Sequence, residues 1–373
     1  MRVDPADDDR YMSLALRLAE KGRGTTSPNP MAGAVVVRRG RIVGRGFHLR
    51  PGLPHAEILA LLEAGPLSEG ADLYITLEPC CHTKKRTPPC VPAVLDSALR
   101  RVIVAMTDPN PLVDGKGIAA LRRAGLPVTV GVKEREAQAL NRTYSHWVTA
   151  KRPYVILKAG MTLDGQIATR TGRSRWITGL PSRRDAHRLR AQADAVLVGV
   201  GTVLKDDPSL IARTGARLAT PADRQPLRIV VDSTLRVPPG AHVLSEQETA
   251  KTLVATTAAA PASRRRVLEE LGIETLILPS AEKQVSLPAL LRALGHRGIT
   301  SVLVEGGGEI NASLLRGKLI DHVCLYVAPL LLGGADATGL IGGRGPARLA
   351  SAPGLRDMKI RSLGDDILVE GDL

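Results

Sequence analysis

The sequence predicts two α/β domains in one chain. A length of 373 residues is too long for one ordinary hydrophobic core and suits two. Helix-like and strand-like stretches alternate in the first half, which favours an α/β/α sandwich with a largely central sheet. Residues 149–153 read as a linker because Pro153 cannot continue a helix, and β-rich runs begin again after it. We therefore expect domains at 1–148 and 149–373.

The elements of the first domain follow from turn residues and hydrophobic periodicity. Asp9 is expected to cap a helix that runs to about Glu20 and stops at Gly22. Arg39 and Gly40 are expected to close a β-hairpin. The expected elements, in order, are the hairpin strands 34–37 and 42–46, a helix at 56–64, a strand at 73–77, a helix at 91–99, a strand at 102–106, a helix at 115–124, a strand at 128–132 and a closing helix to about residue 147.

The second domain contains a further series of strand-like runs with helices between several of them. The expected strands are 154–158, 195–200, 227–231, 252–256, 275–278, 301–304, 322–327 and 367–369, and helices are expected at 183–191 and 288–294. Three glycines at 306–308 follow one strand and precede a helix from about Glu309, where backbone N–H groups can approach a phosphate. A lone glycine triplet is more often a turn, and the sequence has no Rossmann G-x-G-x-x-G fingerprint with its downstream acid.

Charge and composition narrow the classes of partner. The formal net charge of +14 would suit nucleic acid, but arginine is scattered along the chain and aromatic residues make up only 2%, so base-stacking platforms are scarce. A positive field also attracts small phosphorylated ligands, which is the interpretation that we favour. We expect no membrane span, because no apolar run reaches about 18 residues, and no secretory signal, because residues 1–10 are acidic and polar. A cytoplasmic protein is expected.

Three of the four cysteines lie within eleven residues, at Cys80, Cys81 and Cys90. A disulfide framework would spread its cysteines along the chain, whereas a tight cluster downstream of a histidine indicates a metal site. Cys324 lies alone in an apolar run and is expected to be buried in a strand.

The sequence His55-Ala56-Glu57, followed by Pro79-Cys80 and Cys90, supplies the donors of a catalytic zinc site. Such sites use three protein ligands and leave a fourth position for water, whose pKa the metal lowers. A glutamate two residues from the ligand histidine can move protons, as in the zinc nucleobase deaminases. Both segments are expected to open helices, where the dipoles favour thiolates. The alternative is that His55 and Glu57 are surface residues and the cysteines fill a core.

The first domain resembles the deaminase domain of the bifunctional riboflavin biosynthesis enzymes. The resemblance rests on five motifs in order: Pro28-Asn29-Pro30, Gly52-Leu53-Pro54-His55-Ala56-Glu57, Thr76-Leu77-Glu78-Pro79-Cys80, Arg86-Thr87-Pro88-Pro89-Cys90 and Asp108-Pro109-Asn110-Pro111. It implies a cytidine-deaminase-like fold, with zinc on His55, Cys80 and Cys90 and with Glu57 as general acid and base. It also implies substrate contacts at Asn29, His48, His82 and Arg86, the last as a phosphate partner.

Two features of the cysteine loop depart from the family pattern. Cys81 occupies a position where serine is usual, and Lys84-Lys85 makes the loop between Cys80 and Cys90 one residue longer. Cys81 could compete as a ligand, and a first domain without activity stays open as an alternative.

The second domain resembles the reductase domain of the same family, which has a dihydrofolate-reductase-like fold. The motifs are 157–165, 172–178, 189–191, 194–195, 201–203, 206–208, 231–233, 304–308, 328–329 and 333–334. The resemblance implies nicotinamide-cofactor contacts at Gly160, Trp176, Thr202, Asp206, Ser233, Gly307 and Gly308, and substrate contacts at Ser174, Arg190, Arg213 and Glu305. Lys158 and Asp164 are expected to support the site. Arg190 and Arg213 suit a ribose phosphate, although either could be a solvated surface charge. Without the resemblance, Trp176 would be interpreted as a buried core residue.

The two resemblances imply one enzyme with two reactions. A phosphorylated pyrimidine is deaminated at the zinc site, and NADPH then reduces its ribosyl group to ribityl. NADPH in place of NADH, and a homodimer or homotetramer, are implied by the resemblance alone. The rival interpretations are a nucleic-acid deaminase, a reductase with an inactive first domain and a non-catalytic metal-stabilised binding module.

Overall fold

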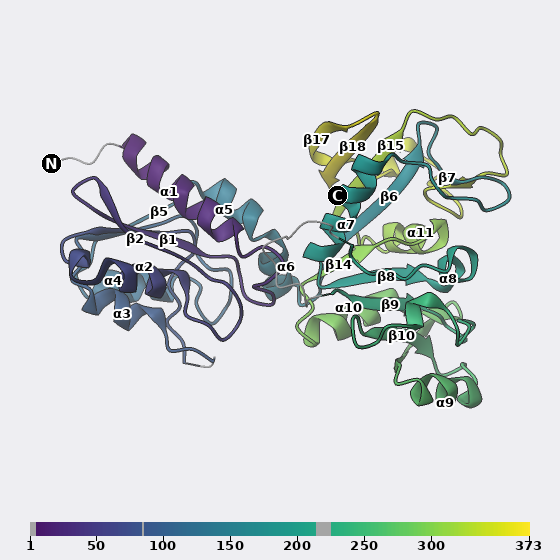
Figure 1. Cartoon of the computed structure of the whole chain (residues 1–373), viewed down its shortest axis with the longest axis horizontal. Coiled ribbons are helices and arrows are strands. Elements are labelled where there is room, and N and C mark those ends of the chain that lie inside the picture. The colour runs from purple at the N-terminus through teal and green to yellow at the C-terminus, as the bar shows by residue number, and fades with distance from the viewer. Residues whose placement is uncertain (1–4, 84–85, 214–224) are drawn as a thin grey trace. The chain divides into compact units, whose positions relative to one another are not determined.

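A computed structural model describes residues 5–83, 86–213 and 225–373 (Figure 1). The chain divides into two compact units, Met1–Lys151 and Arg152–Leu373. The expected boundary after residue 148 falls inside helix α6, Arg142–Ala150. Proline restricts mainly the residue before it, Arg152, so the helix can continue up to residue 150.

The first unit contains a five-stranded sheet in the order β2-β1-β3-β4-β5. Strands β2, β1 and β3 pair antiparallel, and β3, β4 and β5 pair parallel. Arg39 and Gly40 both have positive φ, 48° and 76°, as a two-residue hairpin turn requires, so the expected hairpin is confirmed. The strands are β1 Gly33–Arg38, β2 Arg41–Phe47, β3 Asp72–Ile75, β4 Arg101–Val104 and β5 Val128–Val130.

Helices cover both faces of this sheet, so the expected sandwich is confirmed. Alternate strand residues point to opposite faces: Val36 packs with α2, α3 and α4, whereas Val35 and Val37 pack with α1 and α5. The helices are α1 Pro5–Glu20, α2 Ala56–Ala64, α3 Cys90–Asp96, α4 Lys116–Arg123 and α5 Glu134–Leu140, together with α6, and a short 3-10 turn spans Gly65–Ser68.

Two helix boundaries in this unit differ from the expectation. Helix α1 already includes Asp9, whose carbonyl accepts a hydrogen bond from Ser13, so Asp9 does not cap it. The single closing helix is two helices, α5 and α6, which separate at Asn141. The Asn141 side chain binds the backbone N–H and carbonyl of Met31 at 2.8 and 2.9 Å, a tertiary contact that periodicity could not reveal.

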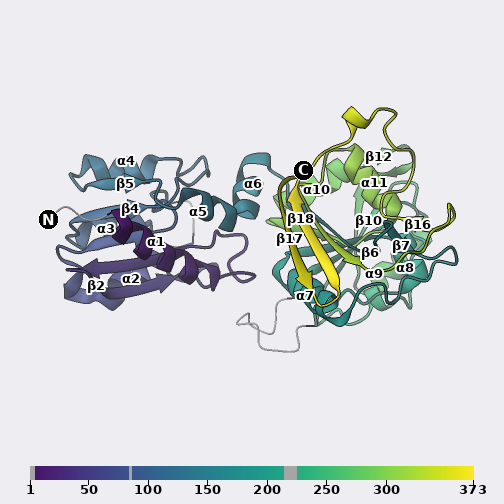
Figure 2. The ribbon, with the colours of Figure 1, turned by 90° about the horizontal axis from the view of Figure 1, so that it is seen from above.

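The second unit contains a nine-stranded sheet in the order β11-β10-β9-β8-β14-β6-β15-β18-β17. All strands from β11 to β15 in this order pair parallel, and β18 and β17 are antiparallel. The strands are β6 Tyr154–Thr162, β8 Ala195–Gly199, β9 Leu227–Val231, β10 Thr252–Thr257, β11 Glu274–Leu278, β14 Ser301–Val304, β15 His322–Ala328, β17 Arg356–Leu363 and β18 Asp366–Asp372. Every expected strand is present, and β17 is an additional strand at the edge of the sheet, where it is exposed (Figure 2).

Helices and two pairs of short strands complete the second unit. The helices are α7 Leu180–Gln192, α8 Val200–Asp206, α9 Ala262–Glu270, α10 Leu287–His296 and α11 Gly308–Arg316; 3-10 turns span His242–Leu244 and Leu349–Ser351; the minor strands are β7 Gln166–Ala168, β12 Ser280–Ala281, β13 Gln284–Val285 and β16 Thr338–Gly339. Helices α8 and α11 begin where β8 and β14 end, so the carboxyl edge of the sheet's centre carries two glycine-containing turns. Among the described helices, none is both long and apolar enough to cross a membrane.

Candidate active sites

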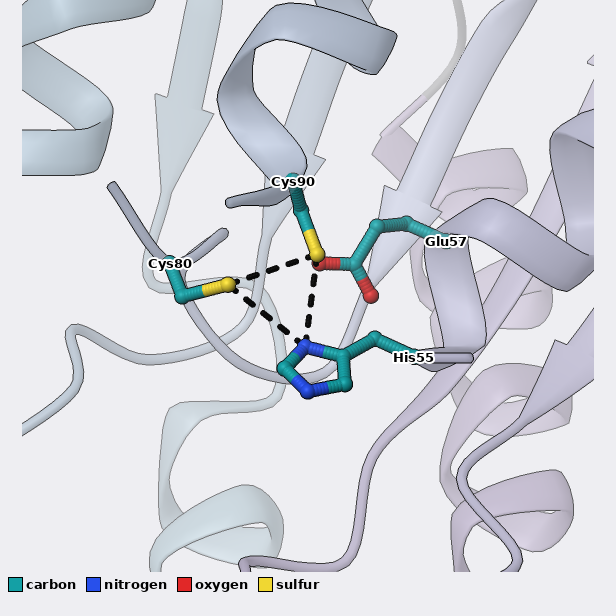
Figure 3. A group of neighbouring side chains, drawn as sticks. All are labelled: His55, Glu57, Cys80 and Cys90. Carbon is teal, nitrogen blue, oxygen red and sulfur yellow. Dashed lines mark hydrogen bonds between the residues drawn. The ribbon is translucent and has the colours of Figure 1, made fainter. Parts of the chain in front are cut away.

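Three potential metal ligands converge at the helix starts of the first unit (Figure 3). His55 precedes α2, Cys90 is the first residue of α3, and Cys80 lies in the segment after β3. His55 Nδ1 lies 3.5 Å from Cys80 Sγ and 3.3 Å from Cys90 Sγ, and the two sulfur atoms are 3.3 Å apart. The expectation that the Cys80 segment opens a helix is wrong: the Cys80 carbonyl instead accepts from the N–H of Cys90, where the helix begins.

These separations fit a tetrahedral zinc ion. Zinc–sulfur and zinc–nitrogen bonds of about 2.3 and 2.0 Å place neighbouring ligand atoms roughly 3.5–3.8 Å apart. The three observed separations are close to this range. His55 Nε2 lies 3.3 Å from the Thr87 hydroxyl, which holds the ring with Nδ1 toward the thiols.

Glu57 completes the cluster on the first turn of α2. Its side chain is buried, and its carboxylate belongs to the same convergent group as the three ligands (Figure 3). Burial raises the pKa of Glu57 above its ordinary value, which favours a carboxyl group that can both give and take a proton.

The expected substrate residues of this unit lie on two sides of the cluster. Asn29 Nδ2 is 3.0 Å from His48 Nε2, and the His48 ring packs edge-on against His55 with a centroid separation of 5.1 Å. His82 is half-buried and Arg86 is exposed, both on the loop that follows Cys80. Lys84 and Lys85 lie outside the described residues.

Cys81 points away from the ligand group and packs against the hydrophobic core beside the sheet. We therefore expect Cys81→Ser to keep the zinc content and ammonia release of the wild type within about twofold, because exchanging a small, half-buried side chain on the core side leaves the ligands in place. Zinc analysis of the purified protein checks this, with Cys80→Ser as the matched variant, which should lose one zinc per chain. Zinc loss in Cys81→Ser would make Cys81 a ligand.

Sequence reasoning gave no role to Glu78, which organises the loop facing the cluster. Its buried carboxylate accepts four backbone N–H groups, those of Asp108, Gly115, Gly117 and Ile118, at 2.8–3.2 Å. A Cβ on Gly117 would lie 2.1 Å from the Pro79 carbonyl oxygen, so only glycine fits there. The signal was present in the sequence, as a carboxylate directly before Pro79-Cys80.

The second unit holds a cavity of about 510 Å³ at the carboxyl edge of its sheet. Eight of the expected site residues line it: Lys158, Gly160, Ser174, Thr202, Asp206, Glu305, Gly307 and Gly308. Sequence reasoning missed other lining residues, among them Ile167, Ala168, Lys205, Glu309, Ile310, Thr338, Gly339 and Gly342. The antiparallel pairing of β7 with β16 brings several of these together from positions about 170 residues apart, which no local pattern reveals.

A nearly buried ion-pair network forms one wall of the cavity. Arg190 donates from Nε and one terminal nitrogen to the two oxygens of Glu305 at 2.7 and 2.8 Å, and Lys158 lies 3.5 Å from the same carboxylate. Although burial opposes ionisation, Arg190 and Lys158 lower the pKa of Glu305 to about 2. The other Arg190 nitrogen donates to the Ile211 carbonyl, so all three nitrogens of this guanidinium have protein partners.

Five expected residues lie beyond the cavity lining: Arg190, which reaches it only through Glu305, and Trp176, Ser233, Arg213 and Asp164. Trp176 is 69% exposed, so its core interpretation is wrong; the Arg183 guanidinium lies 4.6 Å from its ring centroid. Ser233 donates to Gln284, and exposed Arg213 donates to Ser209. Asp164 accepts the N–H groups of Leu332 and Gly333, which fastens that loop to the sheet.

Fold and sites together define a zinc-dependent deaminase domain joined to a reductase domain. Residues 5–106 match the cytidine and deoxycytidylate deaminase zinc-binding region, and residues 153–369 match the RibD C-terminal domain. The chain belongs to the RibD family of riboflavin biosynthesis proteins, and it is a bifunctional deaminase and reductase whose first domain matches a zinc-binding region.

Relatives from distant bacteria match over the whole length. The riboflavin biosynthesis protein RibD of Aquifex aeolicus is 44% identical over 97% of each chain, and that of Escherichia coli is 41% identical over 96% of this chain and 98% of the relative. The structure of Acinetobacter baumannii RibD aligns over 99% of both chains with a TM-score of 0.89 and 36% identity. A deaminase/reductase from Thermotoga maritima aligns over 99% of both with a TM-score of 0.84 and 34% identity.

Proposed function

We propose that the chain deaminates 2,5-diamino-6-ribosylamino-4(3H)-pyrimidinone 5′-phosphate and then reduces the product to 5-amino-6-ribitylamino-uracil 5′-phosphate. The observation that carries this proposal is the presence of both a His55–Cys80–Cys90–Glu57 cluster and a glycine-walled cavity in one chain. The Thermotoga maritima relative is described as a diaminohydroxyphosphoribosylaminopyrimidine deaminase and 5-amino-6-(5-phosphoribosylamino)uracil reductase, which supports the same substrates here.

In the deaminase domain, His55, Cys80 and Cys90 hold the zinc ion. Bound zinc activates water for attack on the amino-bearing carbon. Glu57 takes a proton from the attacking water and gives one to the leaving amine, a role that its burial and raised pKa support. Asn29 and His48 hold the pyrimidine beside the cluster, and His82 and Arg86 meet its phosphate side, where an exposed guanidinium can pair with phosphate oxygens.

In the reductase domain, the residues of the glycine turns that line the cavity would hold the cofactor. NADPH bound there would supply the hydride that reduces C1′ of the sugar. The N–H groups at the start of α11 would bind a cofactor phosphate, and Gly307 and Gly308 would allow its close approach. Gly160, Thr202 and Asp206 line the same space. Trp176 and Ser233 lie outside the lining and would contact any part of the cofactor that extends beyond it.

The substrate enters beside the cofactor, against the polar wall. Ser174, which hydrogen-bonds Asp206 at 3.0 Å, and Glu305 contact the ribose. Arg213 is the more available phosphate partner, because the nitrogens of Arg190 already bind Glu305 and Ile211. Arg190 therefore acts by positioning Glu305, while Lys158 and Asp164 support the site.

Gly308→Ala is expected to raise the KM for NADPH about tenfold, equivalent to about 1.4 kcal/mol of binding free energy. An added Cβ would lie 3.0 Å from Gly342 N and 3.1 Å from the Gly339 carbonyl oxygen, so the cavity wall must move. Steady-state kinetics with varied NADPH measures this. Gly345→Ala is the control, because its Cβ would meet open space, and equal KM values for the two variants would contradict the assignment.

We further propose a homodimer or homotetramer assembled through the reductase domain, working in the cytoplasm on small molecules, with no nucleic-acid or membrane partner. Strand β17 supports the assembly, because this sheet edge is exposed and carries Met358 and Ile360, 58% and 62% exposed. Light scattering of wild type and Ile360→Lys measures the oligomeric state.

The decisive experiment follows ammonia release and NADPH oxidation separately on the pyrimidine substrate. Both signals are expected, and a chelator should abolish ammonia release while NADPH oxidation continues on pre-deaminated substrate. NADPH oxidation without ammonia release would mean that the altered loop between Cys80 and Cys90 has abolished the deaminase activity. Ammonia release from an RNA hairpin, with neither signal on the pyrimidine, would favour a nucleic-acid deaminase.

A further inference from the structure

A second group of metal-binding side chains lies in the reductase unit, apart from the residues that line its cavity. His322 and Cys324 are on β15, and Glu370 and Asp372 are on β18. The strands pair antiparallel with His322 opposite Asp372 and Cys324 opposite Glu370, so all four side chains are on one face of the sheet. Potential ligand atoms of His322, Cys324 and Glu370 lie within 4.8 Å of one another.

Neighbouring side chains already orient two of these donors. Glu370 Oε2 accepts from Arg361 at 3.4 Å, and Oε1 lies 3.8 Å from Cys324 Sγ. His322 Nδ1 is 2.5 Å from Asp372 Oδ1, which also accepts from the Tyr154 hydroxyl. Metal-binding histidines and carboxylates commonly have outer partners of this kind, which fix the direction of the donor atoms.

The chemistry and burial of the group indicate which ion it suits. Thiolate, imidazole and carboxylate donors favour zinc, whereas magnesium and calcium prefer oxygen ligands alone. Cys324 is 2% exposed, but the side chains of His322 and Glu370 are 14% and 27% exposed. An ion can therefore reach the thiol from solvent past these two side chains. The same kinds of donor form the deaminase cluster.

We propose that His322, Cys324 and Glu370 bind a second zinc ion, with Asp372 holding the imidazole. The ion joins β15 to β18, the last strand of the chain, and binding releases the thiol proton to solvent. Because only the folded unit brings the two strands together, zinc stabilises the reductase unit by mass action. The site is independent of the catalytic assignments above.

The test uses the full-length chain with the deaminase thiols removed, Cys80→Ser/Cys90→Ser, titrated with Co²⁺. One equivalent of bound Co²⁺ with a thiolate-to-cobalt charge-transfer band is expected, and Zn²⁺ should displace it. Adding Cys324→Ser should remove the band; Cys81, present in both proteins, is the internal thiol control. Wild type should contain two zinc ions per chain and Cys324→Ser one.

His322→Gln is the second variant, in case Cys324→Ser disturbs the core. Each variant must still oxidise NADPH on pre-deaminated substrate, which shows that the reductase unit is folded. Two results would overturn the proposal and leave the four residues as a hydrogen-bonded network. One is that Cys80→Ser/Cys90→Ser shows no charge-transfer band, and the other is that the band survives both Cys324→Ser and His322→Gln.

Discussion

Glu57→Gln is expected to lower ammonia release by about 10²–10⁴-fold while zinc stays bound. The amide keeps the size of the buried side chain but can neither take a proton from water nor give one to the amine. The three ligands come from other residues, so the metal content should not change. NADPH oxidation on pre-deaminated substrate should equal that of the wild type, because the reaction takes place in the other unit.

The matched control for this variant is Glu63→Gln on the same helix. Glu63 is half-exposed; its Oε2 accepts the Arg45 backbone N–H at 2.9 Å, and its Oε1 lies 3.9 Å from the Arg45 guanidinium. The amide oxygen of glutamine can keep the first contact and the exposed ion pair contributes little, so the replacement should leave ammonia release unchanged. Ammonia release, NADPH oxidation and zinc content are measured on the same preparations. More than a tenth of wild-type ammonia release in Glu57→Gln would remove Glu57 from the proton-transfer role, and loss of zinc would make it a ligand.

Arg190→Met is expected to destabilise the reductase unit by about 3 kcal/mol at pH 7, because removing one member of a buried pair leaves the other charge without its main partner. Among the described residues, the ion-pair partner that Glu305 keeps is Lys158, at 3.5 Å. Hydrogen exchange of β14 and β8 amides measures the loss within this unit alone. Arg184→Met, an exposed position on the same helix α7, is the control and should change stability by less than about 0.5 kcal/mol.

The pH dependence of this effect has a definite sign. Arg190 holds the pKa of Glu305 near 2, below its ordinary 4.5, so the pair stabilises the fold above about pH 4.5 and loses that contribution as the pH falls toward 2. The stability difference between wild type and Arg190→Met should therefore narrow over this range. A difference that stays constant from pH 7 to pH 3 would mean that the variant acts through lost packing and not through charge.

The four side chains that the structure brings together as a candidate zinc site could all be predicted from the sequence. His55, Glu57, Cys80 and Cys90 lie at the ends of short local elements, and both the donor types and their spacing are chemically restrictive. Apart from β17, the strands of the two large sheets were also predictable, because most of them are apolar runs bounded by turn residues.

What only the tertiary structure decided depends on contacts between distant residues. Asn141 ends α5 by binding Met31, and Glu78 gathers N–H groups from a loop 30 to 40 residues away. The direction of Cys81 into the core could not be deduced from its place beside Cys80. The sequence by itself predicted most of the elements and the donors of the candidate zinc site, because these follow from local periodicity and donor chemistry. The structure decided the walls of the reductase cavity and the cluster at His322, because sheet order and register bring their residues together.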